Sequence, residues 1–256
     1  MKVSIITVCY NSAETIEKTI QSVISQSYQD IEYIIVDGGS YDGTLDILAK
    51  YRSRLSKVVS ESDDGIYDAM NKGIALATGD IIGILNSDDC YSNSDVIENI
   101  VSAFKQNDKD MLFADLKFVN DNDKILRYYS AKRFTPNRLK FGIMPPHPTL
   151  FVKKTIYQKY GVYRLDFKIA ADYEIFVRFL LVNRLSYTYL NKCIINMLVG
   201  GVSTSNLQSK KIINQETMKA LELNGIKANY LCISTKYVTK ILEILKGRLL
   251  NYYKKN

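Results

Sequence analysis

Short apolar runs rich in β-branched residues alternate with helix-patterned segments through the first part of this 256-residue chain. Between the first two runs, Ile16, Ile20 and Val23 recur at helical spacing, and Asn11 precedes them as a possible cap with Glu14 as its capping-box partner. Such alternation predicts a parallel sheet with helices on its faces, and therefore an α/β fold. We expect strands at 3–9, 31–36, 57–60 and 81–85, and further helices at about 44–51, 68–77 and 96–104.

The second half of the chain has a different pattern. Residues 111–129 resemble antiparallel strands around a turn at 120–123, and 171–183 has the spacing of a helix. Two further strand-like runs follow at 187–190 and 194–199. The expected architecture is a mostly parallel central sheet flanked by helices, with a smaller antiparallel part and a C-terminal helical tail. We divide the chain into an α/β half (1–115), a second half with the antiparallel strands (116–205) and a helical extension (206–256).

Several classes of protein are excluded or disfavoured by what the chain lacks. The four cysteines are far apart and His147 is the only histidine, which disfavours a disulfide framework and rules out H-E-x-x-H zinc chemistry. Neither G-x-G-x-x-G nor G-x-x-x-x-G-K occurs, and no apolar run is long enough to span a membrane. The first residues are typical of a strand rather than a signal peptide, so we expect a protein of the reducing cytoplasm.

The net charge of +7 is concentrated at one end of the chain. Residues 236–256 contain six basic residues and one acidic residue, which leaves the rest nearly neutral. In the same segment Val238, Ile241, Leu242, Leu245 and Leu249 recur at helical spacing. A basic amphipathic helix from about residue 236 is typical of a peripheral contact with an acidic membrane leaflet, but it is equally compatible with packing on the domain. The clustered charge and the acidic residues elsewhere disfavour nucleic-acid binding.

Polar side chains follow four of the expected strands, where each strand ends. In an open parallel sheet, ligands bind beyond the carboxyl ends of the strands, so these clusters are expected to face one crevice. A single polar cluster can also be a turn or a helix cap, whereas several on one rim favour a binding site. The clusters are 7–11, 37–40, 61–64 and 86–89.

The strongest local signal is Asn86-Ser87-Asp88-Asp89, directly after the apolar run 81–85. Adjacent oxygen ligands at a sheet rim suit Mg²⁺ or Mn²⁺ carrying a diphosphate. The alternative is a turn followed by the cap of the next helix.

Other positions each have a structural alternative beside the functional one. Asp37 is placed to accept a hydrogen bond from a base or ribose or to form a turn, and Gly38-Gly39 allows close approach of a ligand or a tight turn. Lys72 can meet phosphate charge or lie exposed on a helix. His147, between prolines, can bond phosphate or be structural. Asp172 can act as a general base or cap the helix that it begins.

Taken in order, these segments resemble a family of known enzymes. The chain contains Thr7-Val8-Cys9-Tyr10-Asn11, then Val36-Asp37-Gly38-Gly39-Ser40 with Asp42-Gly43-Thr44, then the run from Gly65 to Gly73 (GIYDAMNKG) with Gly79-Asp80. Leu85-Asn86-Ser87-Asp88-Asp89, the His147 loop, Gly161-Val162-Tyr163 and Ala171-Asp172-Tyr173-Glu174 with Arg178 follow. Over about residues 3–205 the chain resembles a family 2 glycosyltransferase with a GT-A fold, of the branch that makes bacterial capsule, O-antigen and exopolysaccharide.

This resemblance implies that 1–115 is the nucleotide-sugar-binding half and 116–205 the acceptor-side half with the catalytic base. It also implies roles for individual residues. Asp172 would be the catalytic base, and Asp88 with Asp89 would hold Mg²⁺ or Mn²⁺. One departure is Asn86, which stands where the family's D-x-D pattern has an acid and removes one charge from the metal site. The nucleotide-sugar-binding set would be Thr7, Tyr10, Asn11, Asp37, Gly39, Asp64, Asn71, Lys72, Ser87 and His147.

The implied activity is transfer of a hexose or hexosamine, with inversion, from a nucleotide-diphosphate sugar to an acceptor hydroxyl. We expect the acceptor to be a saccharide, in particular a lipid-linked one used in surface polysaccharide synthesis, and the enzyme to be cytoplasmic or peripheral at the inner face of the membrane. The alternatives are a metal-dependent nucleotidyltransferase and a non-catalytic protein that binds nucleotide sugars or carbohydrate.

Overall fold

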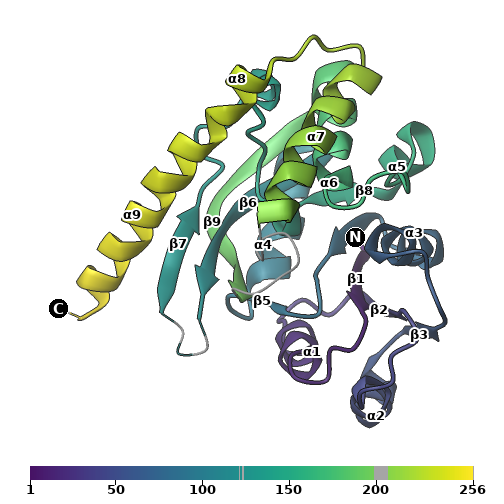
Figure 1. Ribbon diagram of the computed structural model, residues 1–256. Helices are drawn as coiled ribbons and strands as arrows, with labels where there is room; N and C mark the ends of the chain where they lie inside the picture. Colours follow the sequence, from purple (N-terminus) through teal and green to yellow (C-terminus); the bar gives the residue numbers. More distant parts are fainter. Residues whose placement is uncertain (121, 123, 199–206, 256) are drawn as a thin grey trace.

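The computed structural model describes residues 1–120, 122, 124–198 and 207–255. These residues form one nine-stranded sheet whose strands follow the spatial order β3-β2-β1-β4-β8-β6-β9-β5, with β7 paired to β6 (Figure 1). Helices lie on both faces of the sheet, so the predicted α/β class is confirmed.

The first half is the parallel part of the sheet. β1 pairs in parallel with both β2 and β4, and β2 pairs in parallel with β3. Every residue of β1 is buried, because both faces of this strand are covered, and its sequence is accordingly a continuous apolar run. The elements are β1 (Val3–Cys9), α1 (Ile16–Ile24), β2 (Ile31–Asp37), α2 (Thr44–Lys50), β3 (Lys57–Ser60), α3 (Ile66–Leu76), β4 (Ile81–Ile84), β5 (Asp89–Tyr91) and α4 (Val96–Asn107).

The second half is built around β6 (Met111–Val119). This strand is antiparallel to β7 (Ile125–Tyr129) and β8 (Phe151–Lys153) but parallel to β9 (Tyr187–Leu198). The two runs expected at 187–190 and 194–199 form one strand, which is described as far as Leu198. The register of β9 against β6 shifts on either side of Asp115, and these irregularities let the pairing continue through residues 191–193. Val199 lies outside the described residues. The predicted turn at 120–123 includes Asp121 and Asp123, which also lie outside them.

Short helical pieces connect these strands. Two 3-10 helices, Pro136–Phe141 and His147–Thr149, precede β8, and α5 (Lys154–Tyr160) follows it. The helix expected at 171–183 is α6 (Ala171–Phe176), which continues as a π-helical turn over Val177–Val182. All six residues of α6 are buried.

The C-terminal elements are α7 (Leu207–Leu223), α8 (Tyr230–Ser234) and α9 (Lys236–Lys255). Figure 1 shows α9 as a long yellow helix beside β7 at the edge of the molecule. The proposed domain boundary at 205/206 lies outside the described residues. Among the described helices, none combines the length and the apolar character needed to cross a bilayer.

The sheet separates two apolar cores. One core contains side chains of α1, α2 and α4, and the other contains side chains of α3, α6 and the end of α7. Gly73 of α3 packs directly on Ile6 of β1, where a Cβ atom would collide with the isoleucine side chain. This close contact fixes α3 against the sheet and thereby fixes the loop that precedes it.

Candidate functional site

The carboxyl ends of β3, β2, β1 and β4 meet at one edge of the sheet, and the predicted polar clusters come together there. The Gly38 amide donates to the Cys9 carbonyl oxygen at 2.9 Å, which joins the ends of β1 and β2. The Ser12 and Ser87 hydroxyl oxygens lie 2.9 Å apart, which joins the segments that follow β1 and β4. Four separate stretches of chain therefore form one polar edge.

An exposed aromatic ring and a carboxylate flank Gly38 on this edge. Tyr10 is 58% exposed. A Cβ atom on Gly38 would lie 2.6 Å from Oδ2 of Asp63 and 3.4 Å from Cδ2 of Tyr10. Asp63 accepts from the Gly65 amide through Oδ1 at 2.9 Å, which turns its other oxygen over Gly38. The absence of a side chain at Gly38 thus admits the Asp63 carboxylate.

The predicted nucleotide-sugar-binding residues include the neighbouring residue, Asp64, but not Asp63. Asp64 is exposed, and its backbone amide donates to Asp68 at 3.2 Å. The pair Gly38-Gly39 after a strand was the available signal, because two glycines leave room for a side chain from another loop. The motif does not say which loop supplies that side chain.

Asn11 and Gly39 shape the backbone around this surface. Asn11 has a left-handed φ of 48°, and its Oδ1 accepts from the Tyr41 amide at 3.1 Å. It does not cap α1, which begins five residues later at Ile16 after Thr15. Gly39 has a φ of 84° and donates its amide to Asp37 at 3.1 Å.

Two predicted nucleotide ligands are buried instead. The side chain of Thr7 is inaccessible and its hydroxyl lies 3.1 Å from the Tyr33 hydroxyl. Asp37 is also fully buried, and its two oxygens accept from the Gly39 and Ser40 amides and from the Ser40 and Ser60 hydroxyls. These hydrogen bonds lower the pKa of Asp37 despite its burial, which raises it. Both side chains thus have partners within the chain beneath the polar edge, and their contact with a nucleotide stays a prediction.

Two residues of α3 also have internal partners. The Asn71 side chain binds the Tyr163 backbone twice, accepting from its amide at 2.9 Å and donating to its carbonyl at 2.8 Å. Lys72 pairs with Glu61 at 2.9 Å and with Asp68 at 3.2 Å, and donates to the Ser62 carbonyl. Asn71 therefore joins α3 to the segment around Tyr163, and Lys72 holds the loop before α3. Their predicted role in binding the nucleotide sugar stays a prediction.

The segment after β4 presents one accessible carboxylate. Burial raises the pKa of Asp88, and nearby His147 lowers it. Asp89 is fully buried at the start of β5; its Oδ2 accepts from the Asn86 amide at 3.2 Å and its Oδ1 has no partner among the described residues. Asp88 is therefore the more accessible of the two predicted metal ligands, and the role of Asp89 as a ligand stays a prediction.

The remaining donor set fits a divalent ion that is held mainly by its substrate. Within the described part of the chain, no three His, Cys, Asp or Glu side chains are grouped so as to hold a metal. Mg²⁺ in phosphate-transfer sites is commonly bound by one or two carboxylates, substrate phosphates and water, rather than by a protein cage. Asp88 supplies one carboxylate, and the Asn86 amide, whose nitrogen is turned to Asp89, has its oxygen available.

His147 links Asp88 to Asp172. Its Nδ1 lies 3.0 Å from Oδ2 of Asp172, and its charge lowers the pKa of both carboxyl groups. Burial is the largest influence on Asp172 and raises its pKa. The imidazole is partly exposed and contacts Asp172, and its influence reaches Asp88. A row of Asp88, His147 and Asp172 therefore runs from the sheet edge to the start of α6.

The loop that leads into α6, directly before Asp172, is held from two sides by residues that were not predicted as site residues from the sequence. On one side, the Tyr67 hydroxyl donates to the Ile169 carbonyl at 2.5 Å, and the Tyr67 ring stacks on Tyr163 with centroids 5.6 Å apart. On the other side, Glu216 of α7 accepts from three consecutive backbone amides, those of Lys168, Ile169 and Ala170, at 2.7–2.9 Å. No short motif signals Glu216, because its partners are backbone groups about fifty residues away in the sequence.

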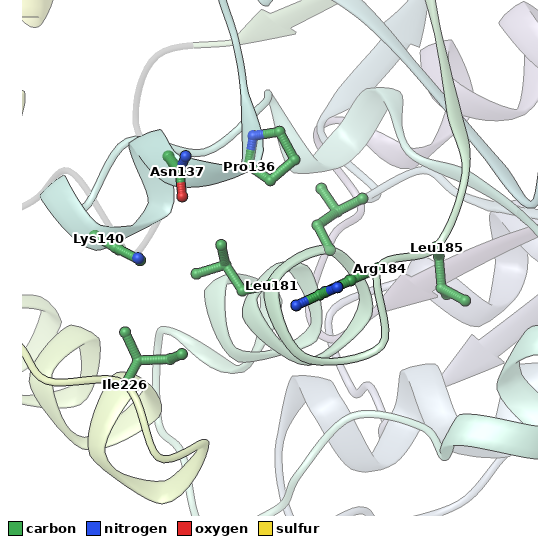
Figure 2. Close-up of a pocket in the computed structure, with 8 residues that line it drawn as sticks. Pro136, Asn137, Lys140, Leu181, Arg184, Leu185 and Ile226 are labelled. Carbon is green, nitrogen blue, oxygen red and sulfur yellow. The ribbon is translucent and has the colours of Figure 1, made fainter.

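A separate pocket of about 380 Å³ lies elsewhere, between the 3-10 helix 136–141, the π-helical turn and Ile226. Figure 2 shows Lys140 and Arg184 on different walls of it, with Leu181 between them. None of the candidate residues at the sheet edge lines this pocket, so it is separate from the candidate site.

Solved structures with the same architecture identify the class. The chain matches a crystal structure of S. aureus TarS 1–349 with a TM-score of 0.67 and 20% sequence identity. The match covers 86% of this chain and 65% of the TarS chain, so this chain spans just under two thirds of the TarS chain. A mannosyltransferase from Pyrobaculum calidifontis, solved with GDP-Man and Mn²⁺, matches all of this chain and 88% of its own with a TM-score of 0.62 at 14% identity. The fold is the GT-A fold of glycosyltransferases.

Sequence comparison then gives the family. The sequence model of glycosyl transferase family 2 matches residues 4–164, and this chain belongs to that family. An uncharacterized glycosyltransferase of Mycobacterium tuberculosis is 34% identical over 70% of this chain and 69% of its own length. A PGL/p-HBAD biosynthesis glycosyltransferase of Mycobacterium bovis is 27% identical over 86% of this chain and 84% of its own length.

Proposed function

We propose that the protein transfers a sugar, with inversion, from a nucleotide-diphosphate sugar to an acceptor hydroxyl. The observation that carries the proposal is the row Asp88, His147, Asp172, which begins at the carboxyl edge of the parallel strands and ends at a buried carboxylate on α6. One acid stands at the donor side and one at the acceptor side, as a single displacement requires.

On the donor side, the nucleotide base would lie over Gly38 between the Tyr10 ring and Asp63. A carboxylate oxygen accepts hydrogen bonds, so Asp63 favours a base that presents an N–H group, such as uracil or guanine, over cytosine, whose ring nitrogen is an acceptor. TarS was solved in complex with UDP-GlcNAc and the Pyrobaculum enzyme with GDP-Man, and both bases have such an N–H group. The donor sugar would then be a hexose or an N-acetylhexosamine.

The diphosphate would lie next to Asp88 and Asn86. A Mg²⁺ or Mn²⁺ ion bound there would supply positive charge to the diphosphate as it departs. The chain itself brings the Asp88 carboxylate to the edge and keeps it partly desolvated. Partial desolvation strengthens its interaction with a cation relative to bulk water.

On the acceptor side, Asp172 would take the proton of the attacking hydroxyl. The bond between this oxygen and the anomeric carbon forms as the bond from that carbon to the diphosphate oxygen breaks, and the nucleotide diphosphate leaves with the electron pair. The configuration at the anomeric carbon inverts because there is one displacement. His147 orients the carboxylate of Asp172, and burial raises its pKa, which makes it a stronger base.

The acceptor would be a saccharide, in particular a lipid-linked one used for a bacterial surface polysaccharide or glycolipid. The relative named for PGL/p-HBAD biosynthesis, which covers most of this chain, supports an acceptor of this general kind.

The experiment is incubation of the full chain with a panel of nucleotide sugars, Mn²⁺ and saccharide acceptors, with detection of released nucleotide diphosphate and of the anomeric configuration of the product. We expect release from one donor and a product inverted relative to it. A retained configuration contradicts the single displacement. Binding of a nucleotide sugar without any release would make the protein a non-catalytic binder, and release of pyrophosphate would make it a nucleotidyltransferase.

A further inference from the structure

The C-terminal helix α9 packs on the body of the protein with its polar side. Glu243 of α9 forms an ion pair with Arg127 of β7 at 2.5 Å, and the ammonium of Lys246 lies 3.8 Å from the centre of the Tyr128 ring. Gly247 is in contact with the Arg127 backbone, where a Cβ atom would lie 2.9 Å from Arg127 N and Cα. The contacts of α9 with β7 thus include an ion pair, a cation–π contact and a glycine.

The opposite side of α9 is apolar and exposed. Its exposed large side chains are Ile241, Leu242, Leu245 and Leu249. They span about one third of the helix circumference, centred near Leu245. The helix therefore packs on the domain through one side and leaves this apolar side uncovered, so the two alternatives left open by the sequence are compatible with one another. The side chain of Val238 lies outside the described residues.

The apolar stripe continues beyond α9. Thr235, between α8 and α9, has helical backbone angles, so the two helices follow one another with little interruption. Leu231 of α8 is 78% exposed and precedes Leu242 by about three helical turns. Beside this junction, Arg138 and Phe141 of the 3-10 helix 136–141 line a hollow of about 500 Å³ with Thr235 and Thr239. We define these exposed residues of α8, α9 and the 3-10 helix as the C-terminal surface.

The charges around this surface are positive. The exposed charged residues of α9, Lys246 and Arg248, lie on either side of the apolar stripe, and its one acid, Glu243, is already paired. The segment from Lys124 to Leu165, which includes the 3-10 helix, contains no Asp or Glu. Basic side chains beside an exposed apolar stripe match an anionic bilayer, because leucines enter the acyl boundary while the cations remain among the headgroups.

We infer that the C-terminal surface docks on an anionic lipid bilayer. Pairing of α9 with α9 of a second copy is disfavoured, because a symmetric contact along the stripe would bring Arg248 and Lys246 of both copies into proximity without an acid between them. The surface is also joined to the acceptor side, since the Tyr173 hydroxyl, next to Asp172, donates to the Leu139 carbonyl of the 3-10 helix. Docking would therefore bring the start of α6 near the bilayer, where a lipid-linked hydroxyl is found.

The experiment is flotation of the full chain with vesicles of phosphatidylcholine alone and of phosphatidylcholine with phosphatidylglycerol. The variant is Leu245→Asp, and the matched control is Leu45→Asp on α2, because these leucines are 48% and 42% exposed and both changes add the same charge. We expect the wild type and Leu45→Asp to float with anionic vesicles only. The partition coefficient of Leu245→Asp into anionic vesicles should be at least about tenfold lower than that of the wild type. The reason is that the free energy gained by burying one leucine side chain exceeds the free energy of a tenfold change in binding. Salt and Arg248→Glu should weaken it as well.

Equal flotation of Leu245→Asp and the wild type would overturn the inference, and so would absence of binding to anionic vesicles. A wild-type dimer in size-exclusion chromatography with light scattering that Leu245→Asp converts to a monomer, without lipid binding, would make the stripe a subunit interface. Thermal stabilisation by the nucleotide is measured for every variant. It reports folding and the donor site independently of docking, so failure of this inference is distinguishable from failure of the proposed function.

Discussion

The Nδ1 atom of His147 lies 3.0 Å from Oδ2 of Asp172, while Oδ1 of the same carboxylate accepts from the Tyr173 amide at 2.7 Å. The two contacts fix the orientation of the carboxylate on both oxygens. His147 belongs to a 3-10 helix and Asp172 to α6, so the contact joins two segments that are far apart in the sequence. In the proposed mechanism the single histidine of the chain would therefore act through Asp172, in addition to its predicted role as a phosphate ligand.

Replacement of the base is the first test of this arrangement. Asp172→Asn keeps the size of the side chain and removes its ability to take a proton, so we expect transfer to fall roughly 10²- to 10⁴-fold. Nucleotide binding, measured by thermal stabilisation, should stay close to wild type because Asp172 lies on the acceptor side. Turnover near the wild-type value would remove Asp172 from the role of base.

The pH profile tests the environment of the same carboxyl group. Burial raises the pKa of Asp172, so its basic form is lost as the pH falls through a value higher than that of an ordinary aspartate. His147 lowers this pKa, and Glu216 raises it; Tyr67 and Tyr163 are the other titratable groups close by. His147→Gln should therefore move the acid limb of kcat/KM to higher pH. An unchanged or lower limb would contradict the contact.

The parallel half of the fold could be predicted from the sequence. Both faces of β1, β2 and β4 are covered, which requires continuous apolar runs, and these runs marked where each strand ends. The partners of the side chains at that edge could not be predicted. Asp37 and Thr7 have the chemistry of ligands, but the fold turns them inward to Ser40, Ser60 and Tyr33. Register and loop path decide such cases, and neither is visible in a local motif.

Asp63 and Asp64 form a matched pair for testing the base-binding surface. Asp63→Asn should weaken binding of the preferred nucleoside diphosphate about 10- to 100-fold, because a hydrogen bond to a charged group contributes ~1.5–3 kcal/mol. Asp64 is the next residue, but Asp63 is the carboxylate that lies over Gly38. We therefore expect Asp64→Asn to bind the nucleotide as the wild type does. Isothermal titration with UDP, GDP and CDP measures both. Equal losses in the two variants would indicate general electrostatics rather than recognition by Asp63.

Glu216 is a positioning residue whose effect is separable from simple loss of stability. Glu216→Gln leaves one of three backbone amides facing an NH₂ group, so we expect ~1–3 kcal/mol of destabilisation and a lower kcat. Because Glu216 raises the pKa of Asp172, the acid limb should also move to lower pH, opposite to the effect of His147→Gln. Glu222→Gln, at an exposed position of the same helix, is the control. A fall in stability with an unmoved pH limb would leave Glu216 with a purely structural role.

The metal site is tested by two adjacent aspartates that differ in burial. Asp88 is the accessible carboxylate, so Asp88→Asn should raise the concentration of Mg²⁺ or Mn²⁺ needed for half-maximal transfer. Asp89 is fully buried at the first position of β5, so we expect Asp89→Asn to leave this concentration nearly unchanged. The measurement is a metal titration of transfer at fixed donor concentration, with unfolding curves for both variants. A shift caused by Asp89→Asn but not by Asp88→Asn would reverse the assignment, and equal titrations for both would show that the ion is held without either carboxylate.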